Sequence, residues 1–79
     1  MDSTINDEIR AILSAVLKRP VGPDEKVVRR EEPRWDSLKH IEIIFAVEDA
    51  LNVQYDEDEV ATLDSLAALV ESVELHRAP

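Results

Sequence analysis

"DSLKHIEIIFAVEDALNVQYDEDEVATLDSLAALVESV", residues 36–73, carries most of the helix signal in this 79-residue chain. Within residues 37–51 the apolar side chains recur at the spacing of three and four that marks an amphipathic helix. At about 100° per residue, one side of this helix holds the predicted core residues His40, Ile43, Ile44, Val47 and Leu51. Asp36 precedes the helix and can cap its first backbone N–H groups.

Two shorter helices are predicted downstream in the same stretch. Asp56 and Glu59 form a capping pair for a helix of little more than one turn. A last helix follows over about residues 65–75, and we expect Asp64 to cap it and its end to fray from Glu74. Its apolar positions are Leu66, Leu69, Val70 and Val73.

A first helix, over about residues 4–18, is predicted upstream from the helical spacing of its isoleucine, leucine and valine residues. Pro20 should end it. Residues 20–35 hold three prolines and the single glycine, and we expect this long connection to pack across the helices with a short turn near Glu25–Val28. With no strand pattern and no repeat, the sequence predicts an all-α fold: one domain over residues 1–79, a four-helix bundle with a long loop between helices 1 and 2 and a short helix 3.

The composition narrows the classes of function. The formal net charge is −9, and Lys39 and Arg77 are the only basic residues after residue 35, which argues against nucleic acid and favours basic protein partners. The chain has no cysteine and is too small to hold a deep catalytic cleft easily, so a self-contained enzyme is not expected. No apolar run approaches the roughly 18 residues of a membrane helix. We expect a monomeric, cytoplasmic protein that binds no membrane and no nucleic acid.

The histidines and the acidic run of residues 56–59 do not predict a metal site. His40 falls on the core side of its helix, so we expect a packed, hydrogen-bonded side chain rather than a catalytic base. His40 and His76 have no partner at a useful ligand spacing. Val60 and Ala61 stand where an EF-hand needs a ligand and a glycine, so we expect no metal, and we expect Trp35 to pack in the loop.

A second side of the helix over residues 37–51 combines apolar and acidic residues. Leu38 and Phe45 lie beside Glu42 and Asp49 on the helical wheel. Ile41 and Glu48 flank them. This arrangement suggests a docking face, and the alternative is that Phe45 folds under the long loop.

The triplet Asp-Ser-Leu occurs twice, at residues 36–38 and 64–66, and its two serines have different surroundings. Ser37 lies where a long proline-containing loop meets the start of the longest acidic helix, a position that tends to be exposed and open to a partner. Ser65 lies in a short connection between two short helices, next to Leu66, which the core needs. Its simplest role is to start a helix.

Residues 36–73, with the order of helices around them, resemble the acyl carrier protein family, in which an Asp-Ser-Leu triplet opens the second helix. The resemblance implies that Ser37 carries covalent 4'-phosphopantetheine from coenzyme A, with Asp36 and Leu38 as its neighbours in the motif. It also implies a partner-binding surface made of Lys39, Ile41, Glu42, Phe45, Glu48 and Asp49. The partners implied are a phosphopantetheinyl transferase and acyl-activating ligase, synthase or acyltransferase enzymes.

Some residues depart from the commonest pattern of the family. Arg34 and Trp35 precede the triplet, where fatty acid synthesis carriers usually have a glycine, and Lys39 and His40 follow it in place of an acidic residue. These differences suggest a stand-alone carrier of acyl or aminoacyl groups in a specialised pathway, although fatty acid and polyketide synthesis stay open. The alternative is an unmodified acidic helical module that acts as a scaffold. His40, at the mouth of the apolar stripe, favours a core that stays closed to the cargo.

Overall fold

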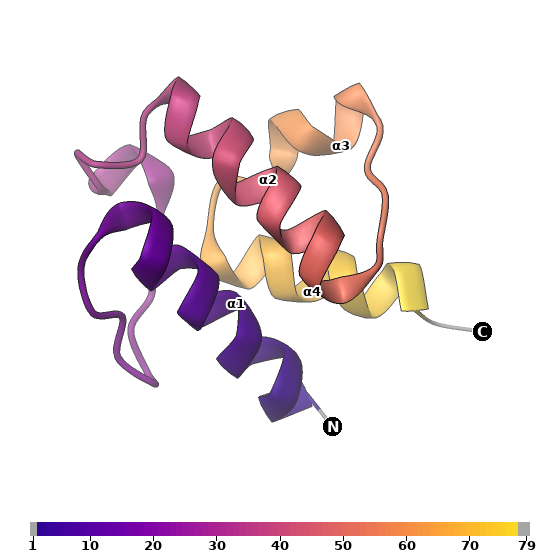
Figure 1. Cartoon of the computed structure of the whole chain (residues 1–79), viewed down its shortest axis with the longest axis horizontal. Coiled ribbons are helices and arrows are strands. Elements are labelled where there is room, and N and C mark those ends of the chain that lie inside the picture. The colour runs from indigo at the N-terminus through magenta and orange to yellow at the C-terminus, as the bar shows by residue number, and fades with distance from the viewer. Residues whose placement is uncertain (1, 78–79) are drawn as a thin grey trace.

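The structure is a computed structural model that describes residues 2–77 of the chain, with side chains from residue 5 to residue 77. Its elements are α1 (Asp2–Leu17), the 3₁₀-helix η1 (Arg29–Glu31), α2 (Ser37–Leu51), α3 (Glu57–Thr62) and α4 (Leu66–Arg77). α1 packs against both α2 and α4, and Figure 1 shows α2 between α1 and the short α3. The predicted all-α fold, with four helices, a long loop after the first and a short third helix, is confirmed.

The core is almost entirely aliphatic, as the composition requires. The predicted core residues of α2 are buried, together with side chains from α1, α4 and the loop. Within the described residues, every buried side-chain nitrogen or oxygen has a hydrogen-bond partner. The buried apolar residues are Ile9, Leu13, Leu17, Val21, Val27, Trp35, Ile43, Ile44, Val47, Leu51, Val53, Leu63, Leu66, Leu69 and Val73.

The long loop is ordered by ion pairs and by two backbone hydrogen bonds with residues 64 and 66, beside the start of α4. The Arg19 guanidinium binds Glu32 at 2.7 Å and also pairs with Glu25. A turn closes over residues 22–25, where the N–H of Glu25 donates to the carbonyl of Gly22, so the expected turn at residues 25–28 is placed three residues too late. Pro23 explains the shift, because proline favours the second position of such a turn. Residue 28 instead forms an isolated antiparallel bridge with Ser65.

Two helix ends differ from the sequence-based expectation. α1 already includes Asp2 and ends at Leu17, because Lys18 takes the left-handed conformation with φ 59°. α4 does not fray at Glu74 but continues to Arg77. Its last turn is held by the bond from Arg77 Nη2 to the carbonyl of Leu51 at 2.9 Å, and by His76, whose Nε2 lies 2.7 Å from Glu59 Oε2.

Candidate functional site at the start of helix 2

The first turn of α2 leaves the Ser37 hydroxyl free of any capping role. Asp36 is the N-cap, and its Oδ1 accepts the backbone N–H of Lys39 at 2.8 Å. Ser37 is therefore the first residue of the helix rather than its cap, and it is exposed. Its Oγ accepts a hydrogen bond from Arg29 Nη2 at 3.3 Å. An exposed hydroxyl is thus presented at the positive end of a helix dipole.

The buried side chain of His40 in α2 forms hydrogen bonds with both the loop and α3. The indole N–H of Trp35 donates to Nδ1 of His40 at 3.0 Å. An indole N–H can only donate, so Nδ1 accepts and Nε2 carries the proton. That Nε2–H donates to the carbonyl of Val60 in α3 at 2.8 Å. The expectations of a packed, hydrogen-bonded His40 and of Trp35 as a packing residue are confirmed.

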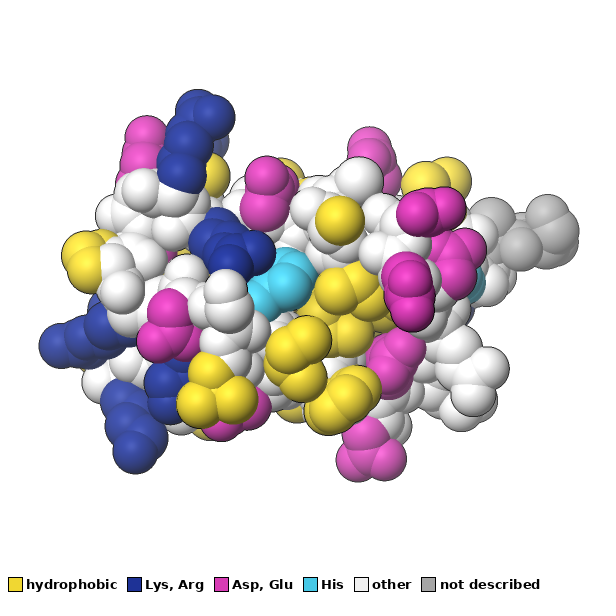
Figure 2. Space-filling model, turned by 90° about the horizontal axis from the view of Figure 1, so that it is seen from above, with side chains coloured by type: hydrophobic (Ala, Val, Ile, Leu, Met, Phe, Trp, Pro, Cys, Tyr) yellow, Lys and Arg dark blue, Asp and Glu magenta, His cyan; other side chains and the backbone are white. Residues whose placement is uncertain are grey.

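The predicted docking face lies open on α2. Leu38 is 66% exposed, Ile41 44% and Phe45 64%. The alternative in which Phe45 folds under the long loop is wrong, because Phe45 faces solvent. Figure 2 shows apolar side chains gathered in the middle of this face. A groove of about 320 Å³ between α2 and α3 is lined by Ile41, Ile44, Phe45, Glu48, Tyr55, Asp56, Glu57 and Val60.

The charged residues around this face are unevenly distributed. Figure 2 shows Lys and Arg side chains toward one end of the face, mixed with some Asp and Glu side chains, and a group of Asp and Glu side chains toward the other end. The basic end contains the loop, which carries arginines at residues 29, 30 and 34 and leads into α2. The acidic end contains the first turn of α3, residues 57–59, where negative charge also complements the helix dipole. The Nζ of Lys39 lies 3.7 Å from Oε1 of Glu42.

Of the acidic residues of α2, Glu48 has a structural role that the sequence did not reveal. Its Oε2 accepts the backbone N–H of Tyr55 at 2.8 Å, which fixes the connection from α2 to α3. The Tyr55 hydroxyl in turn lies 2.7 Å from Ser72 Oγ in α4, and burial raises the pKa of Tyr55 above its ordinary value. Glu42 and Asp49 are exposed, so they are the acidic side chains of α2 most open to a partner.

The second triplet, residues 64–66, is used differently. Ser65 is the capping residue here, because its Oγ accepts the backbone N–H of Ala68 at 3.0 Å. The expectation that Ser65 starts a helix is confirmed, and the expectation that Asp64 caps it is wrong. The N–H of Leu66 donates to the carbonyl of Val27 at 2.9 Å. Ser65 itself is held in an extended bridge with Val28, and α4 begins at Leu66 with the serine at the cap.

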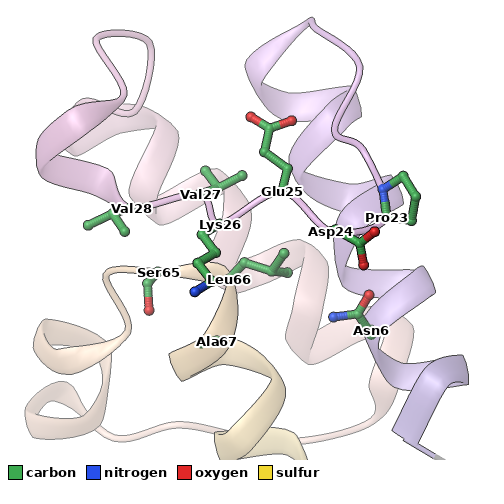
Figure 3. A pocket seen from close by; sticks show the side chains of 10 residues that line it. All are labelled: Asn6, Pro23, Asp24, Glu25, Lys26, Val27, Val28, Ser65, Leu66 and Ala67. Carbon is green, nitrogen blue, oxygen red and sulfur yellow. The ribbon is translucent and has the colours of Figure 1, made fainter.

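A pocket larger than the groove between α2 and α3 lies elsewhere and does not include Ser37. It measures about 460 Å³ and is lined by the loop at residues 23–28, by Asn6 of α1 and by residues 65–67 at the start of α4 (Figure 3). The hydroxyl in its lining is that of Ser65, and its Oγ accepts the backbone N–H of Ala68 at the start of α4. The described residues contain no group of three His, Asp or Glu placed to hold a metal ion. None of their helices is both long and apolar enough to cross a membrane.

Sequence reasoning missed Arg29 among the residues next to the serine. Nothing in the sequence marks it, because it lies eight residues before Ser37 in a loop whose path only the fold defines. The remaining residues proposed from sequence are distributed along one side of α2. Residues 36–38 form its exposed start, and Lys39, Ile41, Glu42, Phe45, Glu48 and Asp49 follow.

Comparison with known proteins identifies the family. No family model and no solved structure matches the chain. The chain is 38% identical over 73 residues to "Acyl carrier protein 3" of Ralstonia nicotianae, a match that covers 90% of this chain and 83% of the relative. The identity and coverage agree with the helix order and with the exposed triplet at the start of α2. This chain therefore belongs to the acyl carrier protein family and is a carrier protein rather than an enzyme.

Proposed function

We propose that Ser37 carries 4'-phosphopantetheine and that the chain presents acyl or aminoacyl groups to partner enzymes as thioesters on that arm. The observation that carries the proposal is the free hydroxyl of Ser37, which Asp36 leaves available by capping α2 itself. The group fits here because Ser37 is exposed and its Oγ contacts the cationic side chain of Arg29, which tolerates a phosphate. When bound, the arm supplies the thiol that a chain without cysteine lacks.

The attachment needs little from the carrier itself. The Ser37 oxygen bonds to the β-phosphorus of coenzyme A, the bond from that phosphorus to the bridging oxygen breaks, and 3',5'-ADP leaves. The hydroxyl proton passes to a base of the phosphopantetheinyl transferase, where Mg²⁺ neutralises the phosphate charge. The carrier's contribution is a hydroxyl held at a fixed helix start, where a negatively charged group is favoured.

Intact mass tests the attachment. The protein, Ser37→Ala and Ser65→Ala are each incubated with a phosphopantetheinyl transferase and coenzyme A. We expect the protein and Ser65→Ala to gain one 4'-phosphopantetheine group and Ser37→Ala to gain none. Modification of Ser37→Ala would contradict the assignment of Ser37 as the site. No modification of the protein would contradict the attachment itself and favour an unmodified scaffold.

The partner-binding surface is proposed on the same side of α2. Exposed Phe45, Ile41 and Leu38 offer apolar contact area, and Glu42 and Asp49 offer charge to a basic partner. Exposed charges act mainly on association, so Asp49→Lys should slow acyl transfer by a basic partner and weaken its dependence on salt. Phe45→Ala should speed dissociation instead.

Two points sharpen this docking test. Glu48 is a poor position for charge reversal, because its bond to the Tyr55 N–H would be lost along with its charge. Glu8→Lys is the matched control, since Glu8 is exposed on α1 and the substitution changes the net charge equally. Equal slowing by Glu8→Lys and Asp49→Lys would show that only the net charge matters.

For the cargo, we infer that α3 stays on α2 when the arm is loaded, so that the acyl chain remains outside the core. The support is the pair of bonds through His40, which join Trp35 to the carbonyl of Val60. Opening there would leave buried polar groups without partners. The melting temperatures of acetyl and octanoyl forms test this, and similar values are expected. A chain sheltered in the core would contribute roughly 0.8 kcal/mol per buried CH₂ and raise the octanoyl value clearly.

A further inference from the structure

We propose that Arg29 binds the phosphodiester of the arm on Ser37 and thereby fixes the point from which the arm leaves the protein. This inference rests on the attachment proposed above. The geometry is already in place, because Arg29 Nη2 lies 3.3 Å from the Ser37 oxygen to which the phosphorus would be bonded. A small rotation of the guanidinium brings it from that oxygen to a non-bridging oxygen of the same phosphate.

The charge of Arg29 is available for this contact. Its guanidinium has no carboxylate partner within the described residues, and the neutral Ser37 hydroxyl is its side-chain contact there. Arg19, by contrast, is committed to Glu25 and Glu32. Arg34 Nη1 donates to the carbonyl of Lys18. A guanidinium prefers phosphate to a hydroxyl, because its planar set of N–H donors can make two charge-assisted hydrogen bonds to phosphate oxygens.

The backbone holds Arg29 in position. Arg29 begins the 3₁₀-helix η1, whose first bond runs from the N–H of Glu31 to the carbonyl of Val28. The N–H of Arg29 itself donates to the carbonyl of Asp64 at 2.8 Å. Because the second triplet anchors its backbone, only the side chain of Arg29 has to be ordered when it binds the phosphate, which lowers the entropy cost of the contact.

The phosphate would need such a cation. It shares the start of α2 with the Asp36 carboxylate, and two anions at one helix end repel each other even though the helix dipole favours each. Lys39 is partly neutralised by Glu42 at 3.7 Å. Arg29 is thus the cation that offsets the second negative charge. Arg30, its neighbour, makes no side-chain hydrogen bond or ion pair with the part of the chain described, and it provides the control.

The first experiment does not depend on the transferase. Phosphoserine is introduced at position 37 in the protein and in Arg29→Ala, Arg29→Lys and Arg30→Ala, and ³¹P NMR follows its second ionisation, ordinarily near about pH 6. A bound cation favours the dianion, so we expect the midpoint in Arg29→Ala to lie about 0.5 unit or more above that of the protein. Arg30→Ala should match the protein, and Arg29→Lys should restore part of the effect.

The second experiment uses the protein carrying the arm, confirmed by intact mass. Without Arg29 the phosphodiester of the arm should move more freely. Its ³¹P transverse relaxation should therefore be slower in Arg29→Ala than in the protein or in Arg30→Ala. The Arg29 Nε–Hε signal should shift when the arm is added. Circular dichroism checks that each variant keeps its helix content.

The outcomes separate the two proposals. Equal midpoints in Arg29→Ala and the protein, or equal changes in Arg29→Ala and Arg30→Ala, overturn the Arg29 contact while a mass gain leaves the arm standing. An Arg29-dependent midpoint without any mass gain keeps Arg29 as a phosphate-binding residue and overturns the arm. A mass gain with Arg29-dependent relaxation and midpoint supports both.

Discussion

The two Asp-Ser-Leu triplets of this protein have the same sequence and opposite roles. At residues 36–38 the aspartate caps, the serine is the first residue of the helix, and the leucine is 66% exposed. At residues 64–66 the serine caps, the helix begins one residue later, and the leucine is 5% exposed. A shift of one residue in the helix start therefore separates a hydroxyl that is free from one that the backbone uses.

The loop causes this shift. The N–H of Leu66 donates to the carbonyl of Val27, and Val28 forms an antiparallel bridge with Ser65. The backbone of the second triplet is therefore extended up to the start of α4. No segment of the described chain pairs in this way with residues 36–38, and there the helix starts directly after Asp36. The role of a triplet thus depends on what its backbone contacts, and not on its three residue types.

The largest expected difference between the triplets lies in their leucines. Leu66→Ala should destabilise the protein by about 2–5 kcal/mol, because it opens a cavity in the core. Leu38→Ala should change the free energy of unfolding by less than about 0.5 kcal/mol, since that side chain faces solvent. Urea unfolding measures both values. Similar losses would mean that Leu38 is also part of the core in solution and would remove it from the docking face.

Alanine substitutions of the aspartate and the serine in each triplet test which of the two residues caps its helix. The expected losses of stability are smaller than that for Leu66→Ala. Asp36→Ala and Ser65→Ala should each cost about 1 kcal/mol, because each removes the acceptor of a first-turn N–H. Asp64→Ala and Ser37→Ala should each cost less than about 0.5 kcal/mol, because neither residue caps a helix. The four variants are compared by thermal and urea unfolding. The reverse pattern at either triplet would show that its helix starts in the other register.

The smallest effect concerns the ion pairs that order the loop leading to the first triplet. Hydrogen bonds from Arg19 hold the pKa values of Glu25 and Glu32 below the ordinary 4.5. Lowered folded-state values mean that the stabilisation is present above about pH 4.5 and is lost as the pH falls through them. Arg19→Gln should therefore reduce stability modestly at pH 7 and progressively less below pH 4.5, while a matched Arg30→Gln should show no such trend. If the loss of stability caused by Arg19→Gln stayed the same at every pH, this would contradict the ion-pair explanation.

The sequence predicted what depends on local pattern. The bounds of α2 at Ser37 and Leu51 follow from its apolar stripe and from Asp36, and the capping box of Asp56 and Glu59 also follows from spacing alone. The prediction of Asp64 as the cap of α4 was wrong, because Asp and Ser both cap well and the contacts of the loop with residues 64–66 cannot be read from the sequence.

For the same reason the candidate site was predicted only in part. Ser37 and the exposed side of α2 follow from helix geometry. The approach of Arg29 to Ser37 and the bond from the Tyr55 N–H to Glu48 both span a loop or a connection whose path tertiary contacts determine.

The uneven distribution of charge across the face of α2 and α3 has a consequence for how a partner arrives. Basic side chains lie toward one end of this face, and a group of acidic side chains lies toward the other, which gives the face a dipole component along its length (Figure 2). In the field of a charged enzyme such a dipole experiences a torque, which turns the protein before the surfaces touch. The end that bears Ser37 would then reach the same side of each complementary partner. Unlike a uniform acidic face, this arrangement fixes the angle of approach as well as its rate.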